Sequence, residues 1–292
     1  MTAGGPRRLA AEVVVDARAR LGEGPAWDAR SGELIWVDIL AGRVHRFDPA
    51  SGADRFVEVG RHVGVAVPRA AGGLLLAVRG GFAVLGDDGT LAPVADVEAD
   101  RPGNRMNDGK CDPRGRLWAG TVADDERPGA GALYRLDPDR SVHRMLGGVS
   151  ISNGLAWSAD GATMYYVDSP SQGVDAFDYD PGSGAIARRR RVVSIPRRDG
   201  TPDGMAIDDD GCLWVALWGG GRVRRHTPDG RPDAQVELPA SQVTSCAFGG
   251  PDRGDLYVTS AARGLAGEPL AGALFRCRPG VRGPLAVPAQ VR

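Results

Sequence analysis

The sequence contains almost no lysine. Of its 36 basic residues, 35 are arginine and only Lys110 is lysine. The chain also lacks an excess of either charge, because 37 acidic residues leave a formal net charge of -1. A chain without a net basic surplus has no electrostatic footprint for nucleic acid or for an acidic membrane surface. We therefore expect no nucleic-acid partner and no membrane partner.

Cysteine is also scarce, and the four cysteines lie far apart. They form no CxxC pair and have no histidine at zinc-finger spacing, a pattern typical of small buried hydrophobic residues in a reducing compartment. The N-terminal segment lacks the apolar core of roughly 7–15 residues that marks a signal peptide. No apolar run approaches the roughly 18 residues that indicate a membrane span. These absences together predict a cytoplasmic protein.

Long helical periodicity is absent, and short apolar runs punctuated by 43 glycines and 21 prolines take its place. Short apolar runs separated by glycine and proline are typical of strands and turns. One strand-like element recurs six times, with the equivalent residues Leu34, Leu74, Leu117, Met164, Leu213 and Leu256. Units of about 40–50 residues indicate β-propeller blades, which must stack radially to bury both faces. We predict an all-β, six-bladed propeller with four antiparallel strands per blade.

The N-terminal run 10–16 precedes the first repeat, and it is apolar. We expect it to supply the outer strand of the last blade, which closes the ring and removes a sheet edge. The whole chain, 1–292, is then a single domain, with 1–9 and 281–292 as flexible or peripheral termini. We expect a monomer or a weak homo-oligomer.

The first strand of each blade is innermost in a propeller, so the residues at its start surround the central channel. The aligned repeats place on this ring Glu23, Val63, Asn107, Asn153, Asp203 and Thr244. Four of these side chains offer carboxylate or amide oxygens, and buried carboxylates without a partner are costly. Oxygen donors without Cys or His favour Ca²⁺ or a similar hard divalent ion. The repeat therefore predicts a cation in the channel.

The stretch RMNDGKCDP (105–113) combines this ring position with a strong turn signal, since Asn, Asp and Gly tolerate positive φ. We interpret it as a turn that presents Asn107 to the channel. Strand alternation would then point Lys110 away from Asn107. Two loops joining second to third strands, 123–130 and 261–272, are long, and they are candidate lids or substrate walls.

Six segments carry a resemblance to a known family: LGEGPAWD (21–28), RMNDGKCDPRGRLWAGT (105–121), ISNGLAWS (151–158), VDAFDYD (174–180), TPDGMAIDDDGCLWVA (201–216) and TSCAFGG (244–250). They resemble the SMP-30/gluconolactonase family, in order, over about 21–276. The resemblance implies a six-bladed propeller that holds one divalent metal and hydrolyses sugar lactones. The oxygen donors on the ring favour Ca²⁺ for this metal, with Zn²⁺, Mn²⁺, Mg²⁺ and Fe²⁺ as alternatives.

The resemblance also implies roles for particular residues. Metal ligands would be Glu23, Asn153 and Asp203, and Asp203 would also be the catalytic acid/base. Substrate contacts would come from Arg105 and Asn107. The resemblance aligns a substrate-facing Glu of the family with Asp125, which is one methylene shorter and lies within a shorter lid, and this departure calls the family's usual sugar preference into question.

The function predicted from these residues is a metal-dependent lactone hydrolase, in which a metal-activated water attacks the lactone carbonyl. Two alternatives remain open: another metal-dependent hydrolase or isomerase of small molecules, and a non-enzymatic calcium-binding propeller. Covalent catalysis has little support because no GxSxG elbow is present. His62, beside ring residue Val63, is a further candidate for the pocket.

Overall fold

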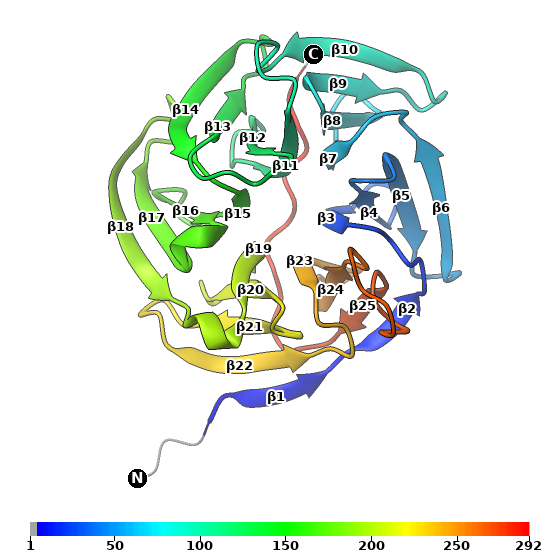
Figure 1. The fold of residues 1–292 in the computed structure, drawn as a ribbon, viewed down its shortest axis with the longest axis vertical. Helices are drawn as coiled ribbons and strands as arrows, with labels where there is room; N and C mark the ends of the chain where they lie inside the picture. Colours follow the sequence, from blue (N-terminus) through cyan, green and yellow to red (C-terminus); the bar gives the residue numbers. More distant parts are fainter. Residues whose placement is uncertain (1–4, 292) are drawn as a thin grey trace.

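The computed structural model describes residues 5–291, which form six small sheets arranged as blades around a central channel (Figure 1). Within each blade the strands run antiparallel from the channel outward, as the repeat predicts. The six-bladed propeller is confirmed.

The first three blades follow the chain in order from the inner to the outer strand. Blade 1 consists of β3 (Gly22–Asp28), β4 (Glu33–Asp38), β5 (Arg43–Asp48) and β6 (Ala53–Glu58). Blade 2 consists of β7 (Val63–Pro68), β8 (Leu74–Val78), β9 (Gly81–Leu85) and β10 (Leu91–Asp96). Blade 3 consists of β11 (Asn104–Cys111), β12 (Leu117–Ala123), β13 (Gly131–Leu136) and β14 (Val142–Val149).

The remaining blades follow the same order, and the last one takes its outer strand from the start of the chain. Blade 4 consists of β15 (Ser152–Trp157), β16 (Thr163–Asp168), β17 (Gly173–Tyr179) and β18 (Ile186–Ser194). Blade 5 consists of β19 (Thr201–Ile207), β20 (Leu213–Trp218), β21 (Arg222–His226) and β22 (Pro232–Glu237). Blade 6 consists of β23 (Val243–Gly249), β24 (Asp255–Ser260), β25 (Leu274–Cys277) and β2 (Glu12–Val15). Two 3₁₀ turns, η1 (Ser169–Ser171) and η2 (Arg197–Asp199), complete the elements.

The ring closes as the sequence predicts, because β2 pairs antiparallel with β25, with Glu12 opposite Arg276. The same pair of residues forms an ion pair of 2.6 Å. In addition, β1 (Arg7–Ala10) pairs in parallel with β22 and adds a fifth strand to blade 5. The start of the chain thus covers the outer edges of two neighbouring blades. Residues 1–4, part of the expected flexible N-terminus, lie outside the described residues.

Buried aromatic side chains join the blades. Trp118 and Trp157 meet edge to face across blades 3 and 4, with ring centroids 6.1 Å apart. Trp27 stacks on Tyr257 across blades 1 and 6 at the same centroid distance, 6.1 Å. Such pairs add specific geometry to the burial of apolar area. Trp27, Trp118 and Trp157 therefore contribute to the packing between blades.

The C-terminal segment departs from the expectation of a flexible or peripheral terminus. Residues 281–291 cross the centre of the ring, from the region of β25 to that of β10 and β11 (Figure 1). At one end Gly283 N donates to the carbonyl of Arg253 in blade 6, and at the other Gln290 N donates to that of Gly115 in blade 3. Both partners lie in turns between first and second strands, so the segment crosses the face opposite the ring residues. Ala289 and Val291 are buried there, which explains why the segment is held in place.

The four cysteines are free and buried, as expected for small hydrophobic residues. Over the described range, no helix is long and apolar enough to cross a membrane.

Candidate metal centre and substrate site

A β-bulge at the start of each inner strand shapes the site. The strand register shifts directly at or after the ring residue in all six blades, for example between Asn153 and Leu155 and between Pro202 and Met205. A bulge bends the strand and re-aims side chains. Asn107, Asp108 and Gly109 therefore lie inside β11 and not in the turn that their composition predicts.

Glycine after the ring position allows neighbouring inner strands to approach closely. A Cβ on Gly64 would lie 2.2 Å from the carbonyl oxygen of Asn107 in the next blade. A Cβ on Gly154 would lie 2.8 Å from the carbonyl oxygen of Asp203. Both separations are shorter than real Cβ contacts, so these positions require glycine. The close approach brings the ring residues of adjacent blades together.

Hydrogen bonds link the amides on the ring. The side-chain Nδ2 of Asn107 donates to Asn153 Oδ1 at 3.0 Å and to the carbonyl of Ser152 at 2.8 Å. The Nδ2 of Asn153 donates in turn to Ser169 Oγ at 2.8 Å. The hydrogen bonds fix the orientation of both amides, so Asn107 Oδ1 faces Arg105 and Asn153 Oδ1 faces Asn107. Sequence alignment and structure agree on these two residues.

Two buried carboxylates, Glu23 and Asp203, complete the oxygen set from blades 1 and 5. Burial, followed by the charges of Asp203 and Asp108, raises the pKa of Glu23 well above its usual range. Burial and then Asp108 raise the pKa of Asp203 in the same way, whereas Arg105 and the Gly204 amide lower it. Neither carboxylate has an ion-pair partner within 4.0 Å among residues 5–291. The site thus gathers two buried carboxylates that form no direct ion pair with a basic side chain of the described residues.

The two other ring positions take no part in this oxygen set. Val63 is fully buried and apolar. Thr244 uses its hydroxyl to donate to the carbonyl of Gly22 at 2.6 Å, which fastens blade 6 to blade 1. The oxygen set therefore comes from four of the six ring positions.

Arg105 stands next to the ring and is only 8% exposed. Its Nη1 donates to Asn107 Oδ1 at 2.7 Å and to the carbonyl of Met106 at 3.1 Å. Burial, followed by the charge of Arg263, lowers the pKa of Arg105 to about 10. The guanidinium stays protonated near neutral pH, and its Nε and Nη2 make no hydrogen bond within the described part of the chain. These donors are available to a ligand.

Asp125 is not brought into the site. Its side chain is 60% exposed and pairs at 3.1 Å with Arg127 of its own loop. The next residue, Glu126, takes a different place: it forms an ion pair of 2.6 Å with Arg263. Sequence alignment alone could not show that Glu126 and not Asp125 contacts Arg263, because this depends on the path of the loop.

The two long loops meet through that ion pair. Glu126 belongs to the loop between β12 and β13 of blade 3, and Arg263 belongs to the loop between β24 and β25 of blade 6. Blades 3 and 6 are opposite in a ring of six, so the pair spans the channel mouth. The ring oxygens beneath are buried, consistent with the predicted lids.

Sequence reasoning missed Asp108 and left Lys110 without a role. Asp108 is buried beside the ring, and its Oδ1 accepts a hydrogen bond of 2.7 Å from Gly109 N. Lys110 Nζ donates to the carbonyl of Met205 at 2.6 Å. Strand alternation predicted Lys110 to point away from Asn107, but the bulge between Met106 and Gly109 changes the alternation.

His62 lies near the rim of the mouth but is engaged elsewhere. Its Nδ1 lies 2.9 Å from the Nη2 of Arg79, and Arg79 also pairs with Asp124 at 2.7 Å. Burial and the charge of Arg79 lower the pKa of His62. The structure therefore places His62 in a rim network with Arg79.

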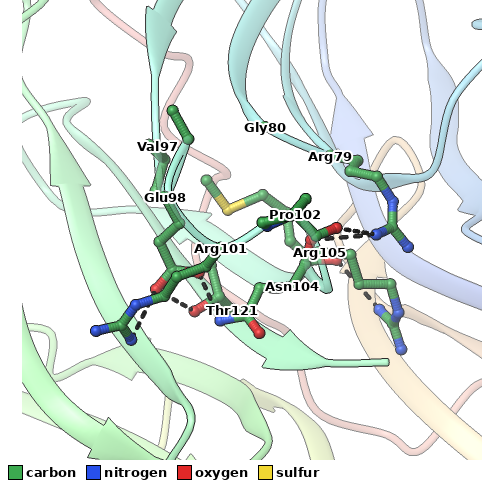
Figure 2. Close-up of a pocket in the computed structure, with 11 residues that line it drawn as sticks. Arg79, Gly80, Val97, Glu98, Arg101, Pro102, Asn104, Arg105 and Thr121 are labelled. Atoms are coloured by element: carbon green, nitrogen blue, oxygen red, sulfur yellow. Dashed lines mark hydrogen bonds and ion pairs between the residues drawn. The ribbon is translucent and has the colours of Figure 1, made fainter. Parts of the chain in front are cut away.

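A cavity of about 240 Å³ lies beside Arg105 and not over the ring. Figure 2 shows it with Arg79 and Arg105 on one side and Arg101 on the other. Asn104 Nδ2 donates to Glu98 Oε2 at 2.8 Å, and Thr121 Oγ1 donates to Glu98 Oε1 at 3.2 Å. This network holds the start of β11 and thereby the position of Arg105.

The donor chemistry fits a hard cation. In residues 5–291 no three His, Cys, Asp or Glu side chains form a group that could hold a metal ion. The set on the ring is instead two carboxylates, from Glu23 and Asp203, with the amide oxygen of Asn153. Carboxylate and amide oxygens suit Ca²⁺ and similar ions. Burial of two carboxylates that have no direct ion-pair partner is costly, and a bound cation would offset that cost.

Comparison with known proteins identifies the family of this chain. The family model of the SMP-30/Gluconolactonase/LRE-like region matches residues 21–262. The chain belongs to this family. The family resemblance read from the sequence is thus confirmed, and the match includes all four ring residues with oxygen donors.

Three proteins of similar sequence or structure illustrate this family. Regucalcin of Xenopus laevis is 43% identical over 261 residues, covering 87% of each chain. A Bacillus subtilis protein with the provisional name sugar lactone lactonase YvrE is 40% identical over 268 residues, covering 89% of this chain and 91% of its own. The crystal structure of a calcium-binding protein, regucalcin, from Agrobacterium tumefaciens is 31% identical, with a TM-score of 0.93 over 99% of this chain and 100% of that one.

Proposed function

We propose that this protein hydrolyses sugar lactones in a divalent-metal site on the propeller ring. The observation that carries the proposal is the buried pair Glu23 and Asp203, which forms no direct ion pair and shares the ring with the hydrogen-bonded amides of Asn107 and Asn153. The 40% identity to a protein named as a sugar lactone lactonase supports the reaction class. The name of the calcium-binding relative supports Ca²⁺ as the ion.

The residues that would hold the ion are Glu23, Asn153 and Asp203. When bound, a divalent ion there supplies Lewis acidity to the substrate carbonyl and makes a bound water more acidic. The hydrogen bond from Asn107 to Asn153 Oδ1 orients that amide oxygen. The side chains of the site are buried, and burial strengthens the polar interactions among them.

Asp203 moves the proton in this proposal. Its carboxylate accepts a proton from the attacking water as the water oxygen bonds to the carbonyl carbon. The same proton passes to the ring oxygen when the lactone C–O bond breaks, which yields the hydroxy acid. Arg105 positions the substrate, since its Nε and Nη2 can donate to hydroxyl or ring oxygens of the lactone.

The test is hydrolysis of a panel of five- and six-membered aldonolactones in weak buffer, followed by proton release with a pH indicator. We expect turnover with at least one lactone, well above the spontaneous rate. The control is the same protein after heat denaturation. Absence of hydrolysis across the panel would favour another small-molecule reaction on the same site.

The ion pair between Glu126 and Arg263 gives a prediction about the lids. Removing either charge with Glu126→Ala or Arg263→Ala should raise KM for the lactone, because the loops lose the contact that holds them over the substrate. An exposed ion pair contributes about 0.2–1 kcal/mol, which corresponds to about a 1.5- to 5-fold change in KM. The exchange Glu126→Arg with Arg263→Glu should bring KM back toward the parent value.

Arg127→Ala is the matched control for the lid variants. It removes an arginine from an exposed ion pair of 3.1 Å in the same loop, but this pair does not cross the mouth. KM should stay at the parent value in this variant. An unchanged KM in both Glu126→Ala and Arg263→Ala, or no recovery of KM on charge exchange, would contradict the proposal that this ion pair holds the two loops over the substrate.

A further inference from the structure

Blade 3 differs from the other five blades at two positions of its inner strand. The residue after the ring position is Asp108 in blade 3, whereas the other blades have Gly24, Gly64, Gly154, Gly204 and Ser245. Two residues later blade 3 has Lys110, and the other blades have Ala26, Ala66, Ala156, Ala206 and Ala247. The single lysine of the chain therefore replaces an alanine that every other blade uses.

Lys110 lies across the channel. Its Nζ donates to the carbonyl of Met205 at 2.6 Å. Lys110 belongs to β11 of blade 3 and Met205 to β19 of blade 5, so the contact joins inner strands that are not neighbours in the ring. A side chain can make such a contact only through the channel. Met205 follows Asp203 by two residues in β19, so the hydrogen bond from Lys110 also contacts the strand that carries Asp203.

The ammonium group, held at the Met205 carbonyl, interacts electrostatically with acidic groups of the site. Burial lowers the pKa of Lys110, while Asp108, Cys246 and Glu23 act in the opposite direction. Asp108, for its part, interacts with Glu23 and Asp203, since its charge raises the pKa of both. Glu23, Asp108 and Asp203 carry three negative charges when ionised, and Lys110 reduces their sum to -2. Arg105 adds its charge at the substrate end, beside Asn107.

We infer that Lys110 is a fixed counter-cation of the ring, which matches the site to one divalent ion and disfavours ions of higher charge. This inference rests on the proposed metal site and goes beyond it by assigning a role to Lys110 and Asp108. The physical reason is that the Coulomb energy of a bound ion with a fixed ammonium is proportional to the ion's charge. Removal of the ammonium therefore favours a trivalent ion more than a divalent one.

The experiment is calorimetric titration of the metal-free protein with Ca²⁺ and with La³⁺, in parent and variants. Lys110→Met removes the charge and keeps an unbranched side chain. We expect an affinity gain of about tenfold or more for Ca²⁺, and a gain for La³⁺ about one and a half times as large on a logarithmic scale. Lys110→Arg keeps the charge and should leave the ratio of the two affinities close to that of the parent.

Asp108→Asn provides the opposite change of charge, and it should weaken La³⁺ binding more than Ca²⁺ binding. The double variant Asp108→Asn with Lys110→Met restores the parent charge, so its affinity ratio should return toward the parent value. If Lys110→Met alone does not fold, Asp108→Asn and the double variant still report the effect of removing the ammonium. Circular dichroism checks the fold of each variant.

The outcomes separate the inference from the proposed function. If the parent binds neither ion, the metal site itself is wrong. If the parent binds Ca²⁺ but Lys110→Met leaves the La³⁺-to-Ca²⁺ ratio unchanged, the counter-cation role is wrong and the proposed function stands.

Discussion

Asp203→Asn should fold like the parent protein and hydrolyse sugar lactones about 10²–10⁴-fold more slowly, the range typical for loss of a general acid/base. The substitution keeps the size of the side chain and removes the charge that accepts the proton. The fold should survive because Asp203 is buried near Glu23 and Asp108, and a neutral amide relieves repulsion there. The measurements are kcat from proton release and the far-UV circular dichroism spectrum.

A matched control for this variant is Asp160→Asn. Asp160 is exposed in the turn between β15 and β16, where its Oδ1 accepts from Ser158 Oγ at 2.6 Å and from Ala162 N at 3.0 Å. The same chemical change at this position should leave kcat within about twofold of the parent, since surface changes are usually small. Full turnover in a folded Asp203→Asn protein would refute the role of Asp203.

Removal of divalent metal should lower both activity and thermal stability. Without a cation the carboxylates of Glu23 and Asp203 are buried next to each other and to Asp108, which is unfavourable. A ligand that binds only the folded state at 100 times its Kd adds about 2.7 kcal/mol of stability. For a domain of this size that corresponds to a change in Tm of about 5–10 °C.

The comparison is between protein dialysed against chelator and the same protein after addition of Ca²⁺, by calorimetry and by lactone hydrolysis. We expect Ca²⁺ to raise Tm and to restore turnover in the parent. Glu23→Gln is the control, because it removes one carboxylate ligand and should reduce the Tm increase caused by Ca²⁺. Equal Tm and equal turnover with and without chelator would show that the ring does not use a metal.

Much of the architecture was readable from the sequence because it repeats. Six copies of one strand pattern require the same local structure six times, and equivalent residues of a closed ring face one axis. For this reason Glu23, Asn107, Asn153 and Asp203 could be placed together without coordinates. The same reasoning predicted the closing strand, which is β2.

Other features depended on contacts between segments that have no relation in sequence. Asp125 and Glu126 are adjacent in the chain, yet only the loop path shows that Glu126 reaches Arg263 while Asp125 turns to Arg127. The C-terminal segment 281–291 has no repeat to align it, and its course across the ring follows from hydrogen bonds to turns of distant blades.

The stretch around Lys110 shows where the limit lies. The sequence by itself determined that Asn107 occupies a ring position and that Lys110 stands where the other blades have alanine. Only the tertiary structure decided that Asn107 to Gly109 form a bulge inside β11 and that Lys110 spans the channel to Met205. The physical reason is that periodicity specifies which strand a residue belongs to, whereas the direction of its side chain after a bulge depends on the strands that pack against it.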